Sequence, residues 1–269
     1  MKKSKTIYVI WIALVLSFIY LPILLLAVYS FTDSTMIGAI RGFSFSNYKT
    51  LFTTPELRDM VVGTIALALG SAFLATILGT CGAIGSFYSK KFMKGFVNSM
   101  NQVPVVNADV VTGFSICILF IVVLGVQKDT FIPLVIGHTV LTAPFVYLSI
   151  IPKLKQMDNN LYEAALDLGA SPAKALFSVV IPQIIPGIIS GFMLAVTLSF
   201  DDYFVTTYTK PATFDTISTY VVNATRGSHT EIKTALWALS TIIFIVVLLV
   251  VVGMNIFGGK KDERQVKAE

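Results

Sequence analysis

Residues 163–191, EAALDLGASPAKALFSVVIPQIIPGIISG, pass from a polar helical pattern through a glycine into a long apolar segment. A helix can end at Gly169, because glycine adopts the left-handed conformation that closes a helix without a Cβ clash. Ser171 and Pro172 follow as the N-cap and first-turn residues of a second helix. This order predicts a docking segment on the face of a membrane protein, where a partner that pushes on it would move the span behind it.

The helix before this glycine has one short apolar face. Its members have the i, i+3, i+4, i+7 spacing of a helix face: Leu161, Ala164, Ala165 and Leu168. One alternative is an amphipathic hairpin that lies on lipid, which favours a polar face rich in Lys or Arg. This helix instead carries Asp158, Glu163 and Asp167 and no basic residue of its own, so we expect it to bind a protein groove.

Prolines and glycines shape the span that follows the docking segment. Pro182 and Pro186 can kink its start, since each removes a helix hydrogen bond. Gly187 and Gly191 form a small-xxx-small pair, which lets another helix approach closely. The sequence thus predicts a bent span with a closely packed neighbour.

The rest of the chain also belongs in a bilayer. Of its 269 residues, 55% are hydrophobic and 13% are charged, and the mean hydropathy is +0.79, which leaves too much apolar surface for one water-soluble core. A helical span needs about 20 mostly apolar residues. Six uncharged runs approach or exceed that length: 6–32, 60–88, 110–127, 130–152, 175–200 and 234–259. We therefore expect an all-α membrane protein with six transmembrane helices.

Positive charge indicates which side of the membrane each loop faces. With the N-terminus placed in the cytoplasm, thirteen Lys and Arg residues lie inside and seven outside, although the outer loops include the longest. This distribution follows the positive-inside rule and predicts that both termini are cytoplasmic. It also accounts for the net charge of +5 without a nucleic-acid-binding face, so we expect no nucleic acid partner.

No motif in the chain supports catalysis. The sequence lacks a phosphate-binding loop of the G-x-x-x-x-G-K-[ST] type. His138 and His229 are isolated, and a lone histidine in a span is most often a packed, hydrogen-bonded residue. We therefore expect no enzyme activity, no cofactor and no metal site. Six helices without an internal repeat are few for a complete pathway, which predicts that a second subunit completes it.

Acidic and aromatic residues after the fifth run are candidates for solute contacts. Asp201 and Asp202 follow a long apolar segment, where a carboxylate is costly unless it faces water or a partner. The aromatic residues after them are Tyr203, Phe204, Tyr208 and Phe214. Aromatic faces beside carboxylates suit ammonium groups, although the two carboxylates would equally serve to end a helix within an aromatic belt. Asp109, before the third run, suits either a helix N-cap or a pathway residue.

Several stretches together resemble a known family. Glu163-Ala164-Ala165, then Gly169, then Ile181-Pro182 is similar to the EAA signature of the integral-membrane permease subunits of binding-protein-dependent ABC importers. Further segments resemble the spermidine/putrescine branch of that family, its second permease in particular: Tyr20-Leu21-Pro22, Val110-Val111-Thr112-Gly113 and Ser199-Phe200-Asp201-Asp202-Tyr203. One departure is Gly63-Thr64, where such permeases often have Asn-Ser or Asn-Thr.

The resemblance implies a single membrane domain over residues 1–269 with the type I (MetI-like) importer permease fold and an importer core at about 57–256. It implies that a coupling loop at about 153–178 seats in a cytoplasmic ATPase through Glu163, Ala164, Ala165, Asp167, Gly169, Ser171 and Pro172. The implied partners are a second permease, two ATPase subunits, an external solute-binding protein and a polyamine solute, in the plasma membrane of a bacterium. ATPase closure would rotate the paired permeases between inward-open and outward-open states.

Two other functions remain open on the sequence. Within the same machinery, the solute is iron or an organic cation instead of a polyamine. In a different class, the chain is a secondary transporter or channel, which would show proton- or sodium-coupled uptake without ATP, or a complete internal repeat. The glycine-broken docking segment argues against this second class.

Overall fold

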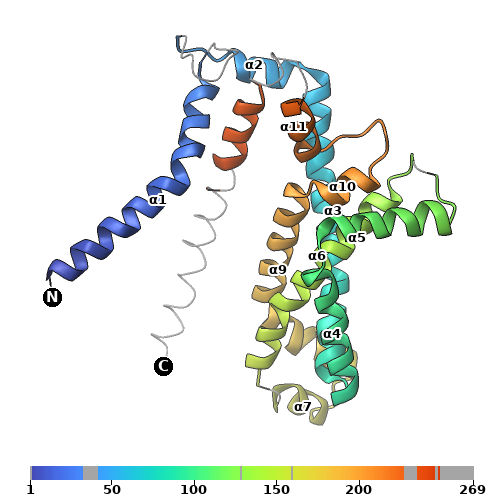
Figure 1. Cartoon of the computed structure of the whole chain (residues 1–269). Coiled ribbons are helices and arrows are strands. Elements are labelled where there is room, and N and C mark those ends of the chain that lie inside the picture. The colour runs from blue at the N-terminus through green and yellow to red at the C-terminus, as the bar shows by residue number, and fades with distance from the viewer. Residues whose placement is uncertain are drawn as a thin grey trace. The chain divides into compact units, whose positions relative to one another are not determined.

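The computed structural model describes residues 2–32, 42–127, 129–158, 160–226, 235–245 and 248. These residues are helical, apart from turns and one isolated β-bridge between Thr32 and Phe43, which confirms the expected all-α class for this part of the chain (Figure 1). The elements are α1 (Lys2–Ser30), α2 (Ser46–Thr53), α3 (Pro55–Tyr88), α4 (Lys91–Val106), α5 (Asp109–Cys117), the π-helix η1 (Ile118–Val123), α6 (Ile132–Gln156), α7 (Asn160–Asp167), α8 (Pro172–Ala175), the π-helix η2 (Leu176–Val180), α9 (Ile181–Asp201), α10 (Phe204–Thr209) and α11 (Ile217–Arg226), followed by a short apolar helix at Ala235–Ile245.

Four stretches of the described chain are long and apolar enough to cross a membrane as helices: Tyr8–Ser30, Pro55–Tyr88, Ile132–Gln156 and Pro172–Asp201. They correspond to four of the predicted runs, those at 6–32, 60–88, 130–152 and 175–200. The short helix Ala235–Ile245 covers part of the sixth predicted run, and most of the rest of that run lies outside the described residues. A bent pair of helices raises the number of spans to five if the pair is one span.

That bent pair corrects the third predicted span. The span was placed at 110–127, but α4 and the segment Asp109–Val123 meet the criteria of a span only together, and they are bent by 102°. Between them the backbone of Asn107 and Ala108 is extended, with ψ of 146° and 137°. Hydropathy missed α4 because Lys, Asn and Gln side chains dilute its apolar residues. If the pair is one span, that span begins at Lys91, and residues 107–109 lie at the break between its two helices.

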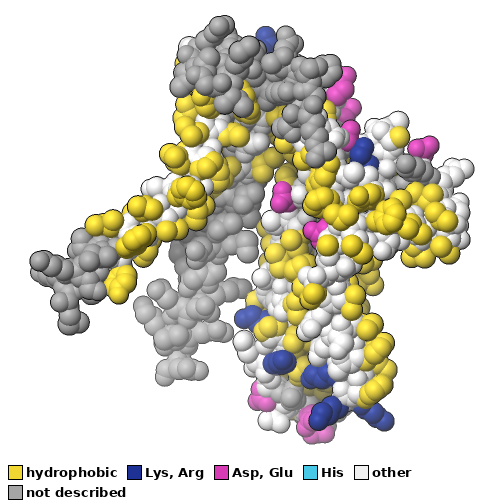
Figure 2. All heavy atoms as spheres, in the orientation of Figure 1, with side chains coloured by type: hydrophobic (Ala, Val, Ile, Leu, Met, Phe, Trp, Pro, Cys, Tyr) yellow, Lys and Arg dark blue, Asp and Glu magenta, His cyan; other side chains and the backbone are white. Residues whose placement is uncertain are grey.

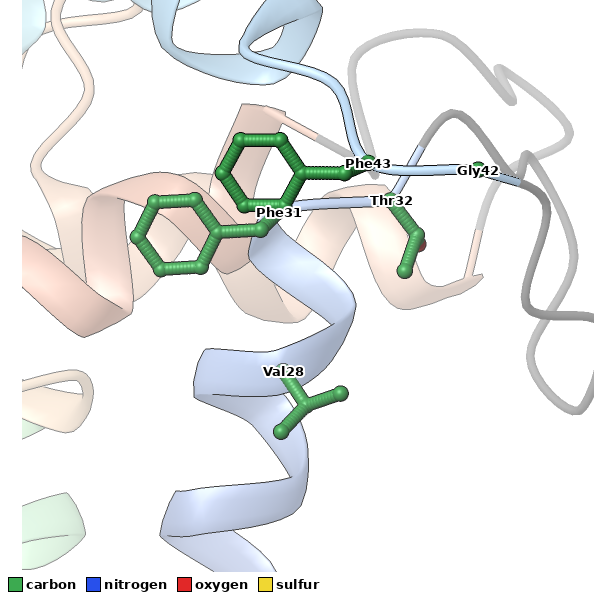
Figure 3. A pocket seen from close by; sticks show the side chains of 5 residues that line it. All are labelled: Val28, Phe31, Thr32, Gly42 and Phe43. Carbon is green, nitrogen blue, oxygen red and sulfur yellow. The ribbon is translucent and has the colours of Figure 1, made fainter.

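The chain divides into two packed units. Unit 1 comprises Met1–Arg58 and Val221–Glu269, and unit 2 comprises Asp59–Tyr220. In unit 1 the apolar window of α1 is entirely unburied, as expected of a helix that lipid or another subunit covers. A pocket of ≈ 320 Å³ after α1 is lined by uncharged residues of the described chain: Val28, Phe31, Thr32, Gly42 and Phe43 (Figure 3). All the acidic residues singled out above lie in unit 2.

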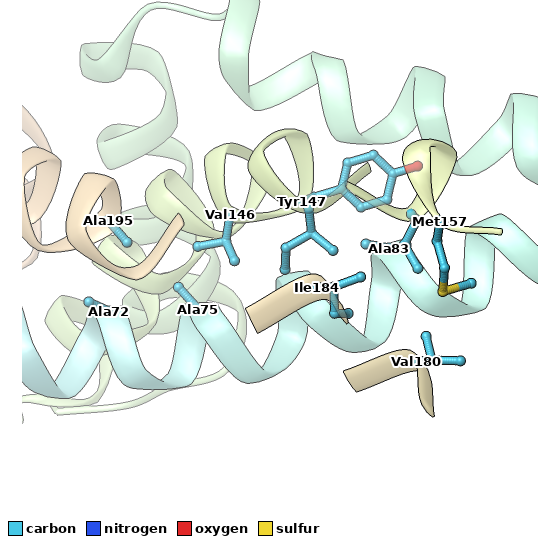
Figure 4. Packing of buried hydrophobic residues seen from close by; sticks show 11 residues of the cluster. Ala72, Ala75, Ala83, Val146, Tyr147, Met157, Val180, Ile184 and Ala195 are labelled. Carbon is cyan, nitrogen blue, oxygen red and sulfur yellow. The ribbon is translucent and has the colours of Figure 1, made fainter. Parts of the chain in front are cut away.

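The core of unit 2 joins α3, α6 and α9. Alanines of α3 face larger side chains of α6 and α9 (Figure 4). Val146 of α6 is fully buried between two glycines. A Cβ atom on Gly79 of α3 would lie 2.8 Å from Val146 Cβ, and one on Gly191 of α9 would lie 3.0 Å from Val146 Cα. At Gly187 a Cβ would lie 3.1 Å from the backbone oxygen of Ser149 in α6. The close helix approach predicted from the two α9 glycines is confirmed, and the neighbour is α6.

The start of the fifth span contains a π-helical turn at the place where the prolines predict an irregularity. The amide of Ile181 donates to the backbone oxygen of Leu176, five residues earlier, and Pro182 follows at once. A widened turn of this kind is a recognised cause of helix bending. The helix continues through it, so α8, η2 and α9 form one continuous segment behind the docking helix.

Candidate functional site

Two regions of unit 2 carry the candidate residues. The first is the coupling loop, residues 153–178, at the end of α6. The second is named the α10 end: it comprises residues 199–209 and the start of α5, residues 109–114.

At the coupling loop the backbone forms the predicted elbow. α7 ends at Asp167, and Gly169 has a φ of +83°, a conformation that L side chains rarely adopt. The amide of Gly169 donates to the oxygen of Leu166 (2.9 Å), and the next amide donates to the oxygen of Ala165 (3.0 Å). These two bonds make a Schellman motif, which satisfies the last carbonyl groups of the helix. The predicted glycine break is confirmed.

The second helix of the elbow also begins as predicted. Ser171 has extended backbone, and its side chain accepts a hydrogen bond from the amide of Lys174 at 3.3 Å. Pro172 is the first helical residue, where its missing amide hydrogen removes no helix bond. Ser171 is therefore the N-cap of α8. The positive-φ glycine and this cap, two residues apart, set the direction in which α7 leaves α8.

α7 turns most of its predicted apolar face outward, while Ala165 is half-buried. Leu168 is 89% exposed and Leu161 is 47% exposed. The exposed residues between them are Glu163, Ala164 and Asp167. On another side of the helix, the ring of Tyr162 lies 5.2 Å from that of Tyr88 at the end of α3. The chain thus holds α7 from one side and leaves an apolar face with carboxylates uncovered, a surface suited to another protein.

Basic side chains gather around the coupling loop. Figure 2 shows Lys and Arg side chains in dark blue at the end of unit 2 that carries α7. The exposed lysines in or next to the helix ends there are Lys90, Lys91, Lys153, Lys155 and Lys174. This is the charge distribution that the positive-inside rule associates with a cytoplasmic face.

At the α10 end, the two adjacent carboxylates have different surroundings. Asp201 is the last residue of α9 and is exposed. Asp202 is 8% exposed, and its carboxylate accepts hydrogen bonds from the amides of Val205 (3.2 Å) and Thr206 (2.7 Å). It also accepts one from the Thr206 hydroxyl at 2.8 Å. Asp202 therefore caps the amino end of α10, whereas the carboxylate of Asp201 is open to its surroundings.

Glycines allow α10 to lie directly on its neighbours. Val205 is fully buried against α5 and α6. A Cβ atom on Gly113 of α5 would lie 2.8 Å from Val205 Cα, and one on Gly137 of α6 would lie 2.8 Å from Val205 Cγ1. Real Cβ atoms do not approach so closely, so both positions need glycine for α10 to occupy this place.

Asp109 is not the N-cap of α5. The cap position is Ala108, and Asp109 is the first helical residue, with an exposed side chain. Its carboxylate is favoured there by the helix dipole rather than by a capping hydrogen bond. α5 packs against α10, whose amino end is capped by Asp202. The structure thus brings Asp109 to the same end of unit 2 as Asp201, Asp202 and Tyr203.

Aromatic rings flank these carboxylates. Tyr203 and Phe204 have ring centroids 5.2 Å apart at the start of α10. Tyr208 meets Phe114 of α5 edge-on, with centroids 5.7 Å apart. Phe114 was not among the sequence candidates, because it lies in an apolar run with nothing local to distinguish it. Carboxylates and aromatic side chains from two separate segments therefore lie at the same end of unit 2.

Phe214 serves a different purpose from the other aromatic residues. Its ring packs over Gly63 of α3, where a Cβ would lie 2.6 Å from Phe214 Cε2. The next residue, Thr64, accepts a hydrogen bond from the amide of Ile217 at 3.0 Å. The Gly63-Thr64 departure noted in the sequence thus anchors the loop between α10 and α11 on α3.

A residue that the sequence did not assign to the α10 end is bonded to it through both of its ring nitrogens. His138 of α6 is fully buried, with Nδ1 2.7 Å from Ser199 Oγ and Nε2 2.9 Å from Thr206 Oγ1. Its Nε2 is also 3.6 Å from Asp202 Oδ2. The expectation of a packed, hydrogen-bonded histidine is confirmed. Its sequence signal was a lone histidine in an apolar run, and its partners are 61 and 68 residues away. Within the described residues, no three His, Cys, Asp or Glu side chains are grouped as metal ligands would be.

Comparison with known proteins gives a family and two sets of relatives. The family described as "Binding-protein-dependent transport system inner membrane component" matches residues 77–258. The "Putrescine transport system permease protein PotI" of Escherichia coli (strain K12) is 32% identical over 234 residues, which cover 84% of this chain and 82% of that protein. The "Spermidine/putrescine transport system permease protein PotC" of the same strain is 28% identical over 248 residues, 92% of each chain.

Solved structures are similar in fold. A chain of a bacterial ABC transporter involved in the import of the acidic polysaccharide alginate has a TM-score of 0.71 at 17% identity, covering 94% of this chain and 96% of that one. A chain of an amino acid ABC transporter has a TM-score of 0.56 at 17% identity, covering 80% of this chain and 97% of that one. At this level of identity the likeness extends to the fold alone.

Proposed function

The chain belongs to the family of binding-protein-dependent transport system inner membrane components, which are non-enzymatic permease subunits of ABC importers, and we propose that it forms half of the translocation pathway of a polyamine importer. The other parts are a second permease subunit, two cytoplasmic ATPases and an external solute-binding protein. The complex lies in the plasma membrane of a bacterium, and polyamine is the solute because the two permeases compared above are named for putrescine and spermidine.

The uncovered face of α7 is the observation that carries the mechanism. Leu161, Ala164 and Leu168 are exposed beside Glu163 and Asp167, on a helix whose direction is set by a positive-φ glycine and a serine cap. An ATPase that binds this face pushes on α7, and the continuous segment α8–η2–α9 carries the displacement to the α10 end. The close contact of α9 with α6 at Gly191 makes the two helices move together.

The solute pathway, in this proposal, passes the exposed carboxylates of the α10 end. Asp201 and Asp109 are open to their surroundings, and Tyr203 lies next to Asp201. The oxygens of Asp202 accept the amides at the start of α10, so this carboxylate adds negative charge without contacting the solute directly. A polyamine carries several ammonium groups, and spaced carboxylates with aromatic faces match that chemistry.

Stimulation of ATP hydrolysis by a panel of solutes tests the solute assignment. The complex is purified with its partner subunits and binding protein, and hydrolysis is measured with putrescine, spermidine, choline and ferric iron. Stimulation by the polyamines alone is the expected result. Stimulation by iron or choline instead would retain the importer and overturn the solute. Uptake that needs a proton or sodium gradient and no ATP would overturn the importer itself.

Cysteine labelling tests the topology that we propose, with six spans and both termini in the cytoplasm. In a background with Cys81→Ser and Cys117→Ser, a membrane-impermeant thiol reagent is applied to intact cells. Ala212→Cys, in the exposed loop after α10, should react from outside. Lys90→Cys, between α3 and α4, should react only after the membrane is opened. The reverse pattern would place the coupling loop outside the cell and refute the proposal that it binds a cytoplasmic ATPase.

Protection from labelling tests the pathway residues. In the same background, Asp201→Cys should react with a small cationic thiol reagent that enters the pathway, and bound polyamine should slow the reaction. Thr53→Cys, an exposed position at the end of α2, is the control that polyamine should leave unaffected. Equal rates at residue 201 with and without polyamine would remove it from the pathway.

A further inference from the structure

A continuous chain of polar side chains runs through the apolar interior of unit 2. It links Ser71 of α3, Ser199 of α9, His138 of α6 and Thr206 of α10, and it ends at Asp202. Ser71 Oγ lies 3.0 Å from Ser199 Oγ, and His138 bridges Ser199 and Thr206. Each of these side chains is at least 90% buried. Buried polar groups are costly unless each one is bonded, so a chain that joins four helices specifies how those helices are placed.

The available hydrogens determine which group donates and which accepts in part of this polar network. The Thr206 hydroxyl has one hydrogen and lies 2.8 Å from Asp202 Oδ2, 3.2 Å from the Asp202 backbone oxygen and 2.9 Å from His138 Nε2. A carboxylate has no hydrogen to donate, so the bond to Oδ2 uses the hydrogen of the threonine. With that hydrogen committed, Thr206 Oγ1 can only accept from His138. Nε2 of His138 therefore carries a hydrogen and donates it to Thr206.

The direction of these bonds connects His138 to the cap of α10. His138 orients the Thr206 hydroxyl, which donates to the Asp202 carboxylate, and that carboxylate accepts the amides of Val205 and Thr206. Asp201 and Tyr203 flank Asp202 in the chain, so their backbone positions follow from how Asp202 is held. A histidine on α6 thereby determines where the exposed carboxylate at the end of α9 lies.

We propose that His138 is a positioning residue for the solute-binding surface: through its Nε2–H and Thr206 it fixes Asp202 as the cap of α10 and so sets the positions of Asp201 and Tyr203. This rests on the proposed function for its effect on transport, although the positioning itself does not depend on which solute is carried. His138 is fully buried and does not touch solute. An apolar residue of similar size would fill the space but leave Thr206 and Ser199 without their shared partner.

Two amide replacements separate positioning from packing. The amide nitrogen of Gln is as many bonds from Cβ as Nε2 of histidine, so His138→Gln can still donate to Thr206. The amide group of Asn corresponds to Nδ1, so His138→Asn keeps only the side that faces Ser199. Thr139→Val is the matched control, because Thr139 is a buried neighbour on α6 whose hydroxyl donates only to its own helix, at Val135 O (2.7 Å).

Hydrogen exchange of α10 in the intact complex gives the direct readout. The amides of Val205 and Thr206 are bonded by Asp202, so they report whether the cap is held. We expect exchange in His138→Asn to be roughly tenfold faster at these amides, the effect of losing about one net hydrogen bond, with exchange in His138→Gln within about twofold of the parent. The half-saturating polyamine concentration should rise in the same order. Thr139→Val should change neither quantity.

Equal exchange in the Gln and Asn variants would overturn the positioning role and leave His138 as a packing residue. If His138→Asn fails to assemble, Thr206→Val and Thr206→Ser replace it: Val should reproduce the faster exchange and Ser should restore the parent rate, and no difference between them overturns the proposal. The exchange measurement needs no solute, so faster α10 exchange without polyamine-dependent transport would refute the solute assignment and retain the positioning.

Discussion

The coupling loop and the α10 end each place a short helix by means of glycines and a helix cap, but one helix is left exposed and the other is packed into the unit. At the coupling loop a glycine with φ +83° and a serine cap act within ten residues of one another, and the resulting helix is left exposed. At the α10 end, Gly113, Gly137 and the Asp202 cap hold a six-residue helix that packs against α5 and α6. In the proposed function, the first region offers a surface to the ATPase and the second positions a surface for the solute.

The difference shows where each region is vulnerable. The elbow depends on local backbone geometry, so a change there alters the direction of α7 and little else. The α10 end depends on contacts between residues far apart in sequence, so a substitution in α5 or α6 should change the position of Asp201. Substitutions that separate these two kinds of dependence test the comparison directly.

Gly169→Val should have the largest effect. A β-branched residue in a left-handed conformation is strained by about 1 to 3 kcal/mol, and here relief of that strain redirects the whole of α7. We expect polyamine uptake near background and at least tenfold less ATPase bound to the purified permease pair, since about 1.4 kcal/mol corresponds to tenfold. Co-purification of the tagged ATPase measures the binding.

Gly169→Asn is the matched control for that prediction. Asparagine tolerates the left-handed conformation, so this variant should retain most of the ATPase binding. If the Val and Asn variants bound the ATPase equally well, the positive-φ break would be irrelevant to coupling. The coupling loop would then not depend on local backbone geometry, contrary to the comparison above.

Gly113→Ala should also have a large effect, through a contact that the local sequence does not show. The new Cβ would lie 2.8 Å from Val205 Cα, so the backbone of α10 must shift. Overpacking of this kind costs about 1 to 3 kcal/mol, and we expect polyamine uptake to fall about tenfold while ATPase binding is retained. Gly85→Ala, where a Cβ meets nothing within 4 Å, serves as control and should transport normally. Loss of ATPase binding in Gly113→Ala would mean that the two regions are not separable.

Asp201→Asn tests the charge of the α10 end without a change of size. A hydrogen bond between an ammonium group and a carboxylate is worth about 1.5 to 3 kcal/mol, so uptake at limiting polyamine should fall roughly tenfold or more. Hydrogen exchange in α10 should stay as in the parent, because Asp201 takes no part in the cap. Asp129→Asn, another exposed carboxylate of unit 2, is the control. Normal uptake by Asp201→Asn would leave the polyamine assignment to resemblance alone.

Ser171→Ala should have the smallest effect of the four. Loss of an N-cap costs about 1 kcal/mol, and the Schellman motif before it remains to direct α7. We expect a fewfold weaker binding of the ATPase, read from a titration of the purified subunits. Ser178→Ala, at an exposed serine of η2 outside the cap, should bind as the parent does. Equal affinity of the two variants would show that the glycine alone sets the elbow.

The sequence predicted the coupling loop almost completely. Gly169, Ser171 and Pro172 act on their immediate neighbours, and local chain geometry responds to local residues in the same way in most folds. The apolar face of α7 was also read from spacing alone. Four of the spans were located by length and hydropathy, because a bilayer requires an uninterrupted apolar run whatever its neighbours are.

The third segment shows the limit of that reading. Hydropathy found its second half and missed α4, where Asn98 and Asn101 bond to α6. The hydroxyl of Tyr147 in α6, for example, donates to Asn98 Oδ1 of α4 and lies 2.9 Å from Ser86 Oγ. A polar residue with a buried partner is compatible with a span, but the partner lies on another helix and gives no local signal.

By itself, the sequence determined the elements whose causes lie within a few residues: the apolar spans, the glycine break, the serine cap and the residue types that suit a cation. Only the tertiary structure decided that Asp202 is a cap and Asp201 is open, that Asp109 joins them, and that His138 reaches across to Thr206. These outcomes depend on which helices come together, and that is set by close packing at residues such as Gly113, Gly137 and Gly191, summed over contacts that no single stretch of sequence contains.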